Sequence, residues 1–283
     1  ATYEGCRPAL FSSRLTSRAF LHVCSAGLAT GQYHENPDPR HWDRKKIRRL
    51  FGEYPNELIG LKVRLGKEIV GSLGLSPLEE AIKLGDELGV PVMVHCSNPP
   101  SKMSDLLSLL RRGDTITHAF QDQGDSILDD RGRISDAANR ARNRGVIFDV
   151  ANANIHFSFA VARQALLEGF LPDTISTDLT TRSLYKRPAV FNLAFVLSKY
   201  LNLGMSLDQV IACGTSNPAR ILNCSGTLGQ LKPGADADIA VFRLMEKETD
   251  FGDRKGEIVK GRILLKPMLT VKQGELVYRD MEF

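Results

Sequence analysis

Features that define several common protein classes are missing from this sequence of 283 residues. No apolar run approaches the ~20 residues that a membrane-spanning helix needs. The net charge of +4 is small, and the basic residues are dispersed except in the segment 44–49, which we interpret as the solvated face of a helix. No G-x-G-x-x-G motif follows a predicted strand. We therefore expect no membrane partner, no nucleic-acid partner and no dinucleotide-binding fold.

Cysteine is scarce and widely spaced. The five cysteines form no C-x-x-C pair and stand at Cys6, Cys24, Cys96, Cys213 and Cys224. This spacing excludes a structural zinc finger and suits reduced thiols, so we expect a cytoplasmic protein. Cys96 directly follows His95 in a predicted strand, which places the two side chains on opposite faces and favours packing over metal ligation for the thiol.

The sequence does contain a regular alternation of strand and helix patterns. Hydrophobic residues make up 42% and charged residues 25%, which is typical of a soluble globular protein with a large core. Between residues 18 and 201 the short links predict right-handed βαβ units and a parallel sheet, with about six strand–helix units. Polar residues gather at the carboxyl ends of these strands, as in a (β/α)8 TIM-type barrel. An open, doubly wound sheet is the alternative.

The pattern changes after Cys224. Turn residues are followed by an alternating strand that ends near residue 242, and then by short strands at 262–265, 269–272 and 275–278. We therefore predict a barrel domain at residues 1–224 and a small β-sandwich domain of composite type at residues 225–283.

One residue, Lys62, conflicts with its surroundings. It lies in the apolar run 58–65, whose only other charged residue is Arg64 and whose composition predicts a strand buried on both faces. A buried ammonium costs several kcal/mol unless it is paired, neutralised or modified. The alternative is a lysine near a strand end that reaches water.

Three further polar groups lie at predicted strand ends, namely His95, His118 and Asp178. In a parallel barrel these ends converge with Lys62 on one rim. Two imidazoles and a carboxylate suit zinc first, and manganese or iron next. A carbamate, formed if CO2 adds to the Lys62 amine, would have two oxygens able to bridge two cations. Asp178 would accept a proton from water and pass it to the leaving nitrogen or oxygen. For each histidine taken alone, a structural role is the alternative.

The order Lys, His, His, Asp on successive strands resembles the amidohydrolase superfamily. Longer stretches, spread over nearly the whole chain, resemble its dihydroorotase-like amidohydrolase/deacetylase metallohydrolases. These stretches are GLKVR (60–64), VMVHCSNPP (92–100), DTITHAF (114–120), ISTD (175–178), TSNPA (215–219) and GADADI (234–239). The resemblance implies that Lys62 is the carboxylated bridging lysine. It also implies that His95 and His118 are ligands of one metal, and that Asp178 is a ligand and the general acid/base.

The sequence departs from the superfamily pattern in one respect. The superfamily has a His-x-His pair on its first strand that binds the other metal, and no such pair occurs here. His34 and His41 follow a later strand, in a polar loop, and are poor substitutes. An open remnant of a barrel would leave unpaired edges, so we expect that about 80 leading residues are missing from this sequence. The alternative is a degenerate paralogue unable to hold two metals.

Candidate substrate contacts are Arg64, Asn98, Asn152 and His156. Arg64 lies two residues beyond Lys62 and shares its face of the strand, so it would bind a substrate carboxylate or a neighbouring acid. Asn98 would bind substrate or hold its turn, and His156 would bind substrate or lie exposed in a loop.

The leading functional hypothesis is a hydrolase with two divalent metals that deacylates a small carboxylated amide or ester, such as an N-acyl amino acid. A cyclic amidase or deaminase using the same site is the first alternative, and a catalytically silent barrel is the second. We expect a small-molecule substrate and a homo-oligomer.

Overall fold

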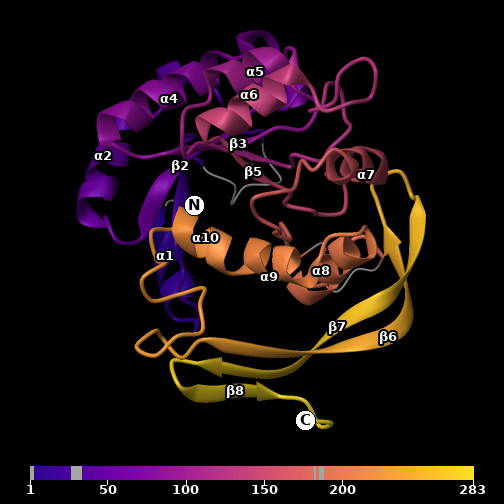
Figure 1. Cartoon of the computed structure of the whole chain (residues 1–283). Helices are drawn as coiled ribbons and strands as arrows, with labels where there is room; N and C mark the ends of the chain where they lie inside the picture. Colours follow the sequence, from indigo (N-terminus) through magenta and orange to yellow (C-terminus); the bar gives the residue numbers. More distant parts are fainter. Residues whose placement is uncertain (1–2, 27–33, 182, 185–187) are drawn as a thin grey trace. The chain divides into compact units, whose positions relative to one another are not determined.

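The computed structural model describes the whole chain except residues 1–2, 27–33, 182 and 185–187 (Figure 1). By its internal contacts the chain forms two compact units. The first comprises residues 1–117, 122–129 and 135–148, and the second comprises residues 118–121, 130–134 and 149–283. The division at residue 224 that the sequence suggests remains a prediction.

The first unit is built on a sheet whose strands follow the order of the chain. They are β1 (Ala19–His22), β2 (Leu58–Arg64), β3 (Val92–His95), β4 (Thr115–Thr117) and β5 (Ile147–Asp149), and the last residue of β5 already belongs to the second unit. The strands from β1 to β4 pair in parallel. Consecutive parallel neighbours need a crossover between each pair, so the α/β class with βαβ units predicted from the sequence is confirmed.

Helices lie in the connections between these strands, and α1 (Tyr3–Phe11) precedes the first strand. The other helices of the first unit are α2 (Arg44–Glu53), α3 (Lys67–Val70), α4 (Ser76–Leu88), α5 (Met103–Leu109) and α6 (Asp136–Arg144), with 3-10 turns at Pro39–His41 and Gly71–Leu73. The side chain of Asp43 caps α2 by accepting from the backbone N–H of Lys46. Pro77 occupies the first turn of α4, and Gly89, with φ of 67°, ends it in the left-handed conformation that glycine tolerates best.

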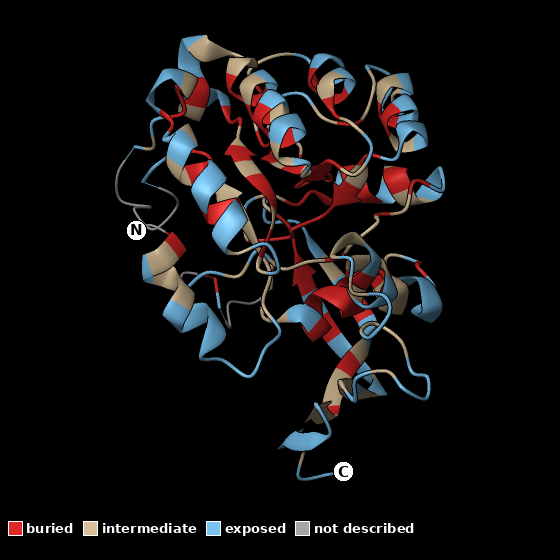
Figure 2. Cartoon of the chain, turned by 90° about the vertical axis from the view of Figure 1, so that its left-hand side faces the viewer, coloured by how far each residue is buried: buried red, intermediate tan, exposed pale blue. Residues whose placement is uncertain are grey.

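One face of the parallel sheet is apolar, and α4 packs on it. The side chains at most 1% exposed on this face are Leu61, Val63, Val92, Val94 and Ile116. The strand register pairs Val63 with Val94, and Val94 with Ile116, so the buried face runs continuously across β2, β3 and β4. Helix α4 contacts both β2 and β3. In Figure 2 these strands are coloured mainly as buried.

The strand that carries Lys62 is buried on one face rather than on both. Along β2 the fully buried Leu61 and Val63 alternate with Lys62 and Arg64, which are only half-buried. The expectation of burial on both faces is therefore wrong. The second face of this strand carries polar groups that remain partly accessible, so the Lys62 ammonium is not enclosed in an apolar core.

The second unit combines helices with an antiparallel sheet. Its helices are α7 (Phe159–Leu167), α8 (Leu193–Asn202), α9 (Leu207–Gly214) and α10 (Ser216–Ile221), and its strands are β6 (Ile239–Gly252), β7 (Ile258–Lys272) and β8 (Glu275–Arg279). The predicted strands at 262–265 and 269–272 are one continuous strand, β7. Helix α8 is tied to β7 because the Ser198 hydroxyl accepts from the backbone N–H of Leu265 at 2.8 Å.

The strand predicted near residues 174–179 is reduced to one isolated bridge, between Asp149 and Thr174. Further backbone bonds run beside this bridge, from the N–H groups of Val150, Asn152 and Ala153 to the carbonyls of Thr174, Ser176 and Thr177. Ala151 and Ala153 have φ of 33° and 43°, which breaks the extended conformation that a ladder needs. The segment 174–177 is therefore aligned beside the chain that follows β5 without forming a regular strand.

Within the described ranges of the chain, no helix combines the length and the apolar character needed to cross a lipid bilayer.

Candidate active site

The polar face of the parallel sheet carries Lys62, Arg64 and His95. The register pairs His22 of β1 with Lys62 of β2, and Arg64 of β2 with His95 of β3. Paired residues of neighbouring strands point to the same side, and so do residues two apart along one strand. Strand spacing of ~4.8 Å and a rise of ~3.3 Å per residue put the Cα atoms of Lys62 and His95 about 8 Å apart. The structure thus brings two of the predicted metal ligands onto one face, at strand ends.

His118 follows β4 directly and is 3% exposed. Its Nδ1 lies 2.8 Å from the carbonyl oxygen of Ala151. A carbonyl oxygen only accepts hydrogen bonds, so Nδ1 carries the proton, and the lone pair of the neutral ring is on Nε2. A metal-ligating histidine has this tautomer when its second nitrogen donates to a backbone carbonyl.

His156 stacks against His118 in the second unit. The ring centroids are 4.0 Å apart and the planes are inclined by 32°. His156 is half-buried, so it is not the fully exposed loop residue that the sequence left as an alternative.

Three of the predicted site residues have backbones in the left-handed region. The φ angles are 52° for Asn98, 67° for His118 and 48° for Asp178. For residues other than glycine this conformation costs ~1–3 kcal/mol, and it tends to occur at functional sites. Asp178 itself is exposed and lies just past the segment 174–177, so its carboxylate is accessible to a bound molecule.

Asn152 is fully buried beyond the end of β5. Its Nδ2 donates to the carbonyl of Ala189 at 3.2 Å and approaches that of Ala153 at 3.5 Å. Both neighbours are acceptors, which fixes the amide with its nitrogen toward them. Among the described residues the amide oxygen, Oδ1, has no hydrogen-bond partner. A buried acceptor without a partner costs ~1–3 kcal/mol, so this oxygen is well placed for a ligand donor.

Two predicted substrate contacts are held by carboxylates of the first unit. Arg64 Nη1 lies 2.6 Å from Oε1 of Glu35. Asn98 Nδ2 donates to Oε2 of Glu68 at 3.1 Å. Of the two partners considered for Arg64, the neighbouring acid is therefore present in the structure, and the substrate carboxylate remains a prediction.

Sequence reasoning missed the surroundings of Glu35. His22 Nε2 lies 3.0 Å from Oε2 of Glu35, although the angles there do not make a hydrogen bond. The backbone N–H of Cys24 donates to His22 Nδ1 at 3.0 Å. Glu35 belongs to no motif and lies in a polar loop, so the sequence held no signal for its role.

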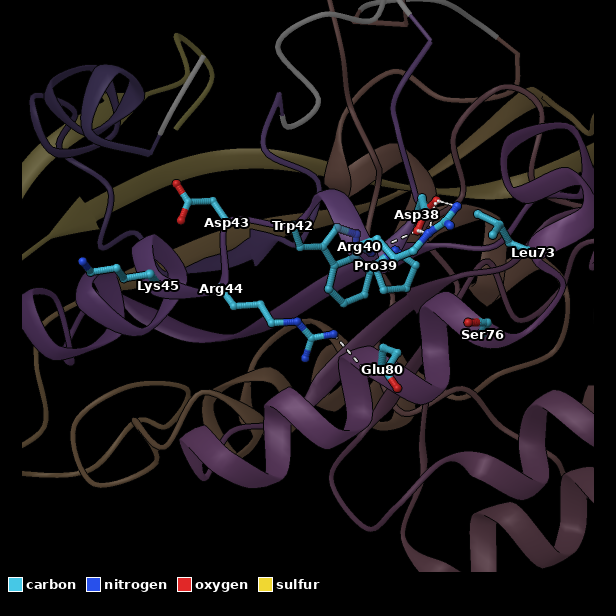
Figure 3. Close-up of a pocket in the computed structure, with 10 residues that line it drawn as sticks. All are labelled: Asp38, Pro39, Arg40, Trp42, Asp43, Arg44, Lys45, Leu73, Ser76 and Glu80. Carbon is cyan, nitrogen blue, oxygen red and sulfur yellow. Dashed lines mark hydrogen bonds and ion pairs between the residues drawn. The ribbon is translucent and has the colours of Figure 1, made fainter.

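An open pocket of about 720 Å³ lies beside the start of α2 in the first unit (Figure 3). Four of its charged side chains form two pairs, Arg40 with Asp38 and Arg44 with Glu80. The described residues that line it include none of the predicted site residues, so we assign it no role in the chemistry.

Comparison with known proteins decides the family. The model of the amidohydrolase family matches residues 18–276, which is most of the chain. The chain belongs to the amidohydrolase family. The family resemblance inferred from the strand-end residues is therefore confirmed.

The curated relatives of this amidohydrolase include deacetylases. A deacetylase of Agrobacterium fabrum is 32% identical over 280 residues, which cover 98% of this chain and 68% of the relative. A deacetylase of Enterococcus faecalis is 31% identical over 232 residues, which cover 81% of this chain and 62% of the relative. The chain thus spans about two thirds of the length of these relatives.

Solved structures confirm the fold of the amidohydrolase. A crystal structure described as a dihydroorotase superposes with a TM-score of 0.89 at 31% identity, and covers 99% of this chain and 73% of its own. One described as an adenine deaminase gives a TM-score of 0.91 at 27% identity, with 98% and 74% covered.

Members of the amidohydrolase family are in general metal-dependent. The donors in this chain fit a divalent metal on two observations. The proton of His118 is held at Nδ1 by Ala151, and Lys62 and His95 share one face at neighbouring strand ends. The imidazoles of His95 and His118 offer nitrogen donors of the kind that zinc, manganese or iron accept.

Proposed function

We propose that this amidohydrolase cleaves the amide bond of a small carboxylated molecule such as an N-acyl amino acid, and releases the acyl group as a free acid. The deacetylases of Agrobacterium fabrum and Enterococcus faecalis, at 32% and 31% identity, support this reaction. The observation that carries it is the contact of His118 with Ala151, which leaves Nε2 as the basic nitrogen of a buried imidazole.

We further propose which residues hold the metal. His95, His118 and Asp178 would be ligands, and Lys62, carboxylated by CO2, would bridge two ions. Zinc is the first candidate, with manganese and iron as alternatives. When bound, the ions would polarise the substrate carbonyl and make water more acidic.

The protein residues would then handle the proton and the substrate. Asp178 accepts a proton from the attacking water, whose oxygen forms the new bond to the acyl carbon. As the carbon–nitrogen bond breaks, Asp178 returns that proton to the leaving nitrogen, so the products are a carboxylic acid and an amine. The exposed position of Asp178 suits this exchange, whereas the Nδ1 proton of His118 is already engaged. Arg64, Asn98, Asn152 and His156 would contact the substrate.

There are two alternatives to this function. The dihydroorotase and adenine deaminase structures, with TM-scores of 0.89 and 0.91, favour a cyclic amidase or a deaminase using the same residues. The second alternative is a barrel without catalytic activity, and it applies to a protein that has no His-x-His pair.

A substrate panel separates these functions. Purified, metal-loaded protein would be incubated with N-acetyl amino acids, with dihydroorotate and with adenine, and the release of acetate, ring-opened acid or ammonia would be measured. We expect acetate. Ring opening without acetate release would instead support a cyclic amidase, and ammonia release without acetate would support a deaminase.

A pair of lysine variants tests the metal. Lys62→Ala should lose bound metal and activity, whereas Lys67→Ala, at an exposed position in the same unit, should keep both. A protein that binds no metal and is unaffected by Lys62→Ala would favour the catalytically silent barrel. Bicarbonate added before metal loading should raise the activity if Lys62 is carboxylated.

A further inference from the structure

A buried carboxylate, Glu35, lies between His22 and Arg64 in the first unit. The side chains of Glu35 and His22 are each 8% exposed, and that of Arg64 is 31% exposed. Oε1 of Glu35 lies 2.6 Å from Arg64 Nη1, and Oε2 lies 3.0 Å from His22 Nε2. Burial acts to raise the pKa of Glu35, but His22 and Arg64 outweigh it and the pKa is lowered, so Glu35 is ionised.

The hydrogen bonding of His22 fixes where its proton lies. Its Nδ1 accepts from the backbone N–H of Cys24, so a neutral ring carries its proton on Nε2, the nitrogen that faces Glu35. The protonated nitrogen therefore lies 3.0 Å from the carboxylate. Its proximity stabilises the charge of Glu35 together with Arg64.

His22, Cys24 and Glu35 also have the side-chain types of a metal site, and their ligand atoms lie within 4.8 Å of one another. Two of these residues already have other partners. Nδ1 of His22 accepts from the Cys24 amide, and one oxygen of Glu35 pairs with Arg64. Burial, with Glu35 adding to it, raises the pKa of the Cys24 thiol to about 12, far from the thiolate that a metal needs. The cluster is better suited to holding a guanidinium than a metal ion.

Arg64 has unused hydrogen-bonding capacity on the site face. It pairs in register with His95 and lies two residues beyond Lys62 on the same face. Its guanidinium carries five N–H donors, and its recorded bond among the described residues is the one from Nη1 to Glu35. The remaining donors can bind a second carboxylate, because the planar guanidinium presents pairs of N–H groups that match the two carboxylate oxygens.

We propose that Arg64 binds the carboxylate of the substrate, and that Glu35 and His22 are positioning residues that hold its guanidinium in place. The proposal rests on the proposed function as a deacylase and adds a rule of selection, namely that acidic substrates are preferred to neutral ones of the same shape. A long arginine side chain loses rotamer entropy when it is fixed, and because Glu35 already holds Arg64 in the unliganded protein, that loss does not oppose substrate binding.

A matched pair of substrates tests this selection. An N-acetyl amino acid and its primary carboxamide differ only in the charged group, and kcat and KM would be measured for both. In Arg64→Gln we expect kcat/KM for the acid to fall by about 10- to 100-fold, mainly through KM, with the carboxamide little changed. Arg48→Gln is the control, because Arg48 of α2 forms an exposed pair with Glu87 of α4. This variant should leave kcat/KM unchanged for both substrates.

For Glu35 and His22, the measurement must distinguish a positioning role from damage to the fold. Glu35→Gln and His22→Asn should raise KM for the acid by several-fold and leave kcat for the carboxamide unchanged. The double variant Arg64→Gln/Glu35→Gln should be no worse than Arg64→Gln alone, because Glu35 acts through Arg64. Equal losses on both substrates, or additive losses in the double variant, would overturn the positioning role.

The outcomes separate this proposal from the function on which it rests. If the wild type cleaves both substrates equally well, or Arg64→Gln leaves their ratio unchanged, the role of Arg64 is overturned and deacylation stands. If the wild type cleaves neither, deacylation is overturned. Calorimetric binding of the acid and the carboxamide to wild type and Arg64→Lys then tests Arg64 directly, with weaker binding of the acid by the lysine variant expected, and equal binding refuting the proposal.

Discussion

His118 donates from Nδ1 to the carbonyl oxygen of Ala151 at 2.8 Å, and both residues have positive φ, 67° and 33°. Neither residue is a glycine, so both backbones are strained, and the hydrogen bond joins the two strained points. The orientation of a buried imidazole is thereby set by a residue far along the chain. A metal ligand needs such a second partner, because it fixes the ring and the tautomer.

Removing the metal should abolish the activity reversibly. We expect that a chelator inactivates the protein and that zinc, manganese or iron restores it, because the acyl carbonyl is no longer polarised without the ion. His118→Gln should lower metal affinity by at least about 10-fold, as measured by competition with a coloured chelator. His41→Gln, at an exposed position, is the matched control. Full activity in the chelated protein would contradict metal dependence.

Replacing Asp178 should affect turnover more than binding. Asp178→Asn keeps the shape of the side chain but cannot carry the proton, so kcat should fall by about 10²- to 10⁴-fold with a small change in KM. The pH dependence of the residual kcat should lose the limb that reports deprotonation of the carboxylate. Asp236→Asn, at an exposed position in the second unit, should retain wild-type kcat. A wild-type pH profile in Asp178→Asn would assign the proton transfer to another group.

Asn152 should distinguish amides from esters. Its buried Oδ1 has no partner among the described residues, and the N–H of a secondary amide could fill that place, whereas an ester has no such donor. In Asn152→Leu we expect kcat/KM for an N-acyl amino acid to fall by about 10- to 100-fold and that for the matching ester to change little. Comparing the two substrates in the same variant controls for damage to the fold. A parallel loss on both would show that Asn152 is only structural.

Lys199 should make stability depend on pH. The residue is fully buried in α8, where its Nζ donates to the carbonyls of Ala189 at 2.7 Å and Gly252 at 2.9 Å. Burial lowers its pKa to about 7, with Asp253 acting in the opposite direction. Between that value and the ordinary pKa of 10.5 the unfolded chain binds the proton more strongly, so the free energy of unfolding should rise with pH across this window.

The size of this effect has an upper bound. At ~1.4 kcal/mol per pKa unit the rise is at most about 5 kcal/mol, and the two carbonyl partners reduce it. Denaturant unfolding of the wild type and of Lys199→Met between about pH 6 and pH 11 would measure the slope, which the variant should lack. Lys247→Met, at an exposed position on β6, should keep it. A slope that persists in Lys199→Met would assign it to other groups.

Local patterns in the sequence predicted much of the fold. The cap at Asp43, the proline in the first turn of α4 and the glycine that ends it act within a few residues, and all appear where the pattern places them. The alternation of strand and helix gave the order of the parallel strands. Lys62 and His95 lie on one face because side chains alternate along a strand, and because Arg64, two residues after Lys62, pairs with His95.

Other predictions failed where distant segments decide the conformation. The strand expected near residues 174–179 is a single bridge, because positive φ at Ala151 and Ala153 interrupts the ladder beside it. Burial of Lys62 on both faces was wrong, because apolar composition does not reveal which face of a strand a helix covers.

The sequence by itself determined most of the secondary structure, the family and the chemical types available at the strand ends. Only the tertiary structure decided how those groups are held. Ala151 sets the tautomer of His118, and Arg64 donates a hydrogen bond to Glu35. Capping and periodicity act over a few residues, and can be read along the chain. Hydrogen bonds between residues about 30 positions apart form only when packing brings the two segments together, so no local pattern encodes them.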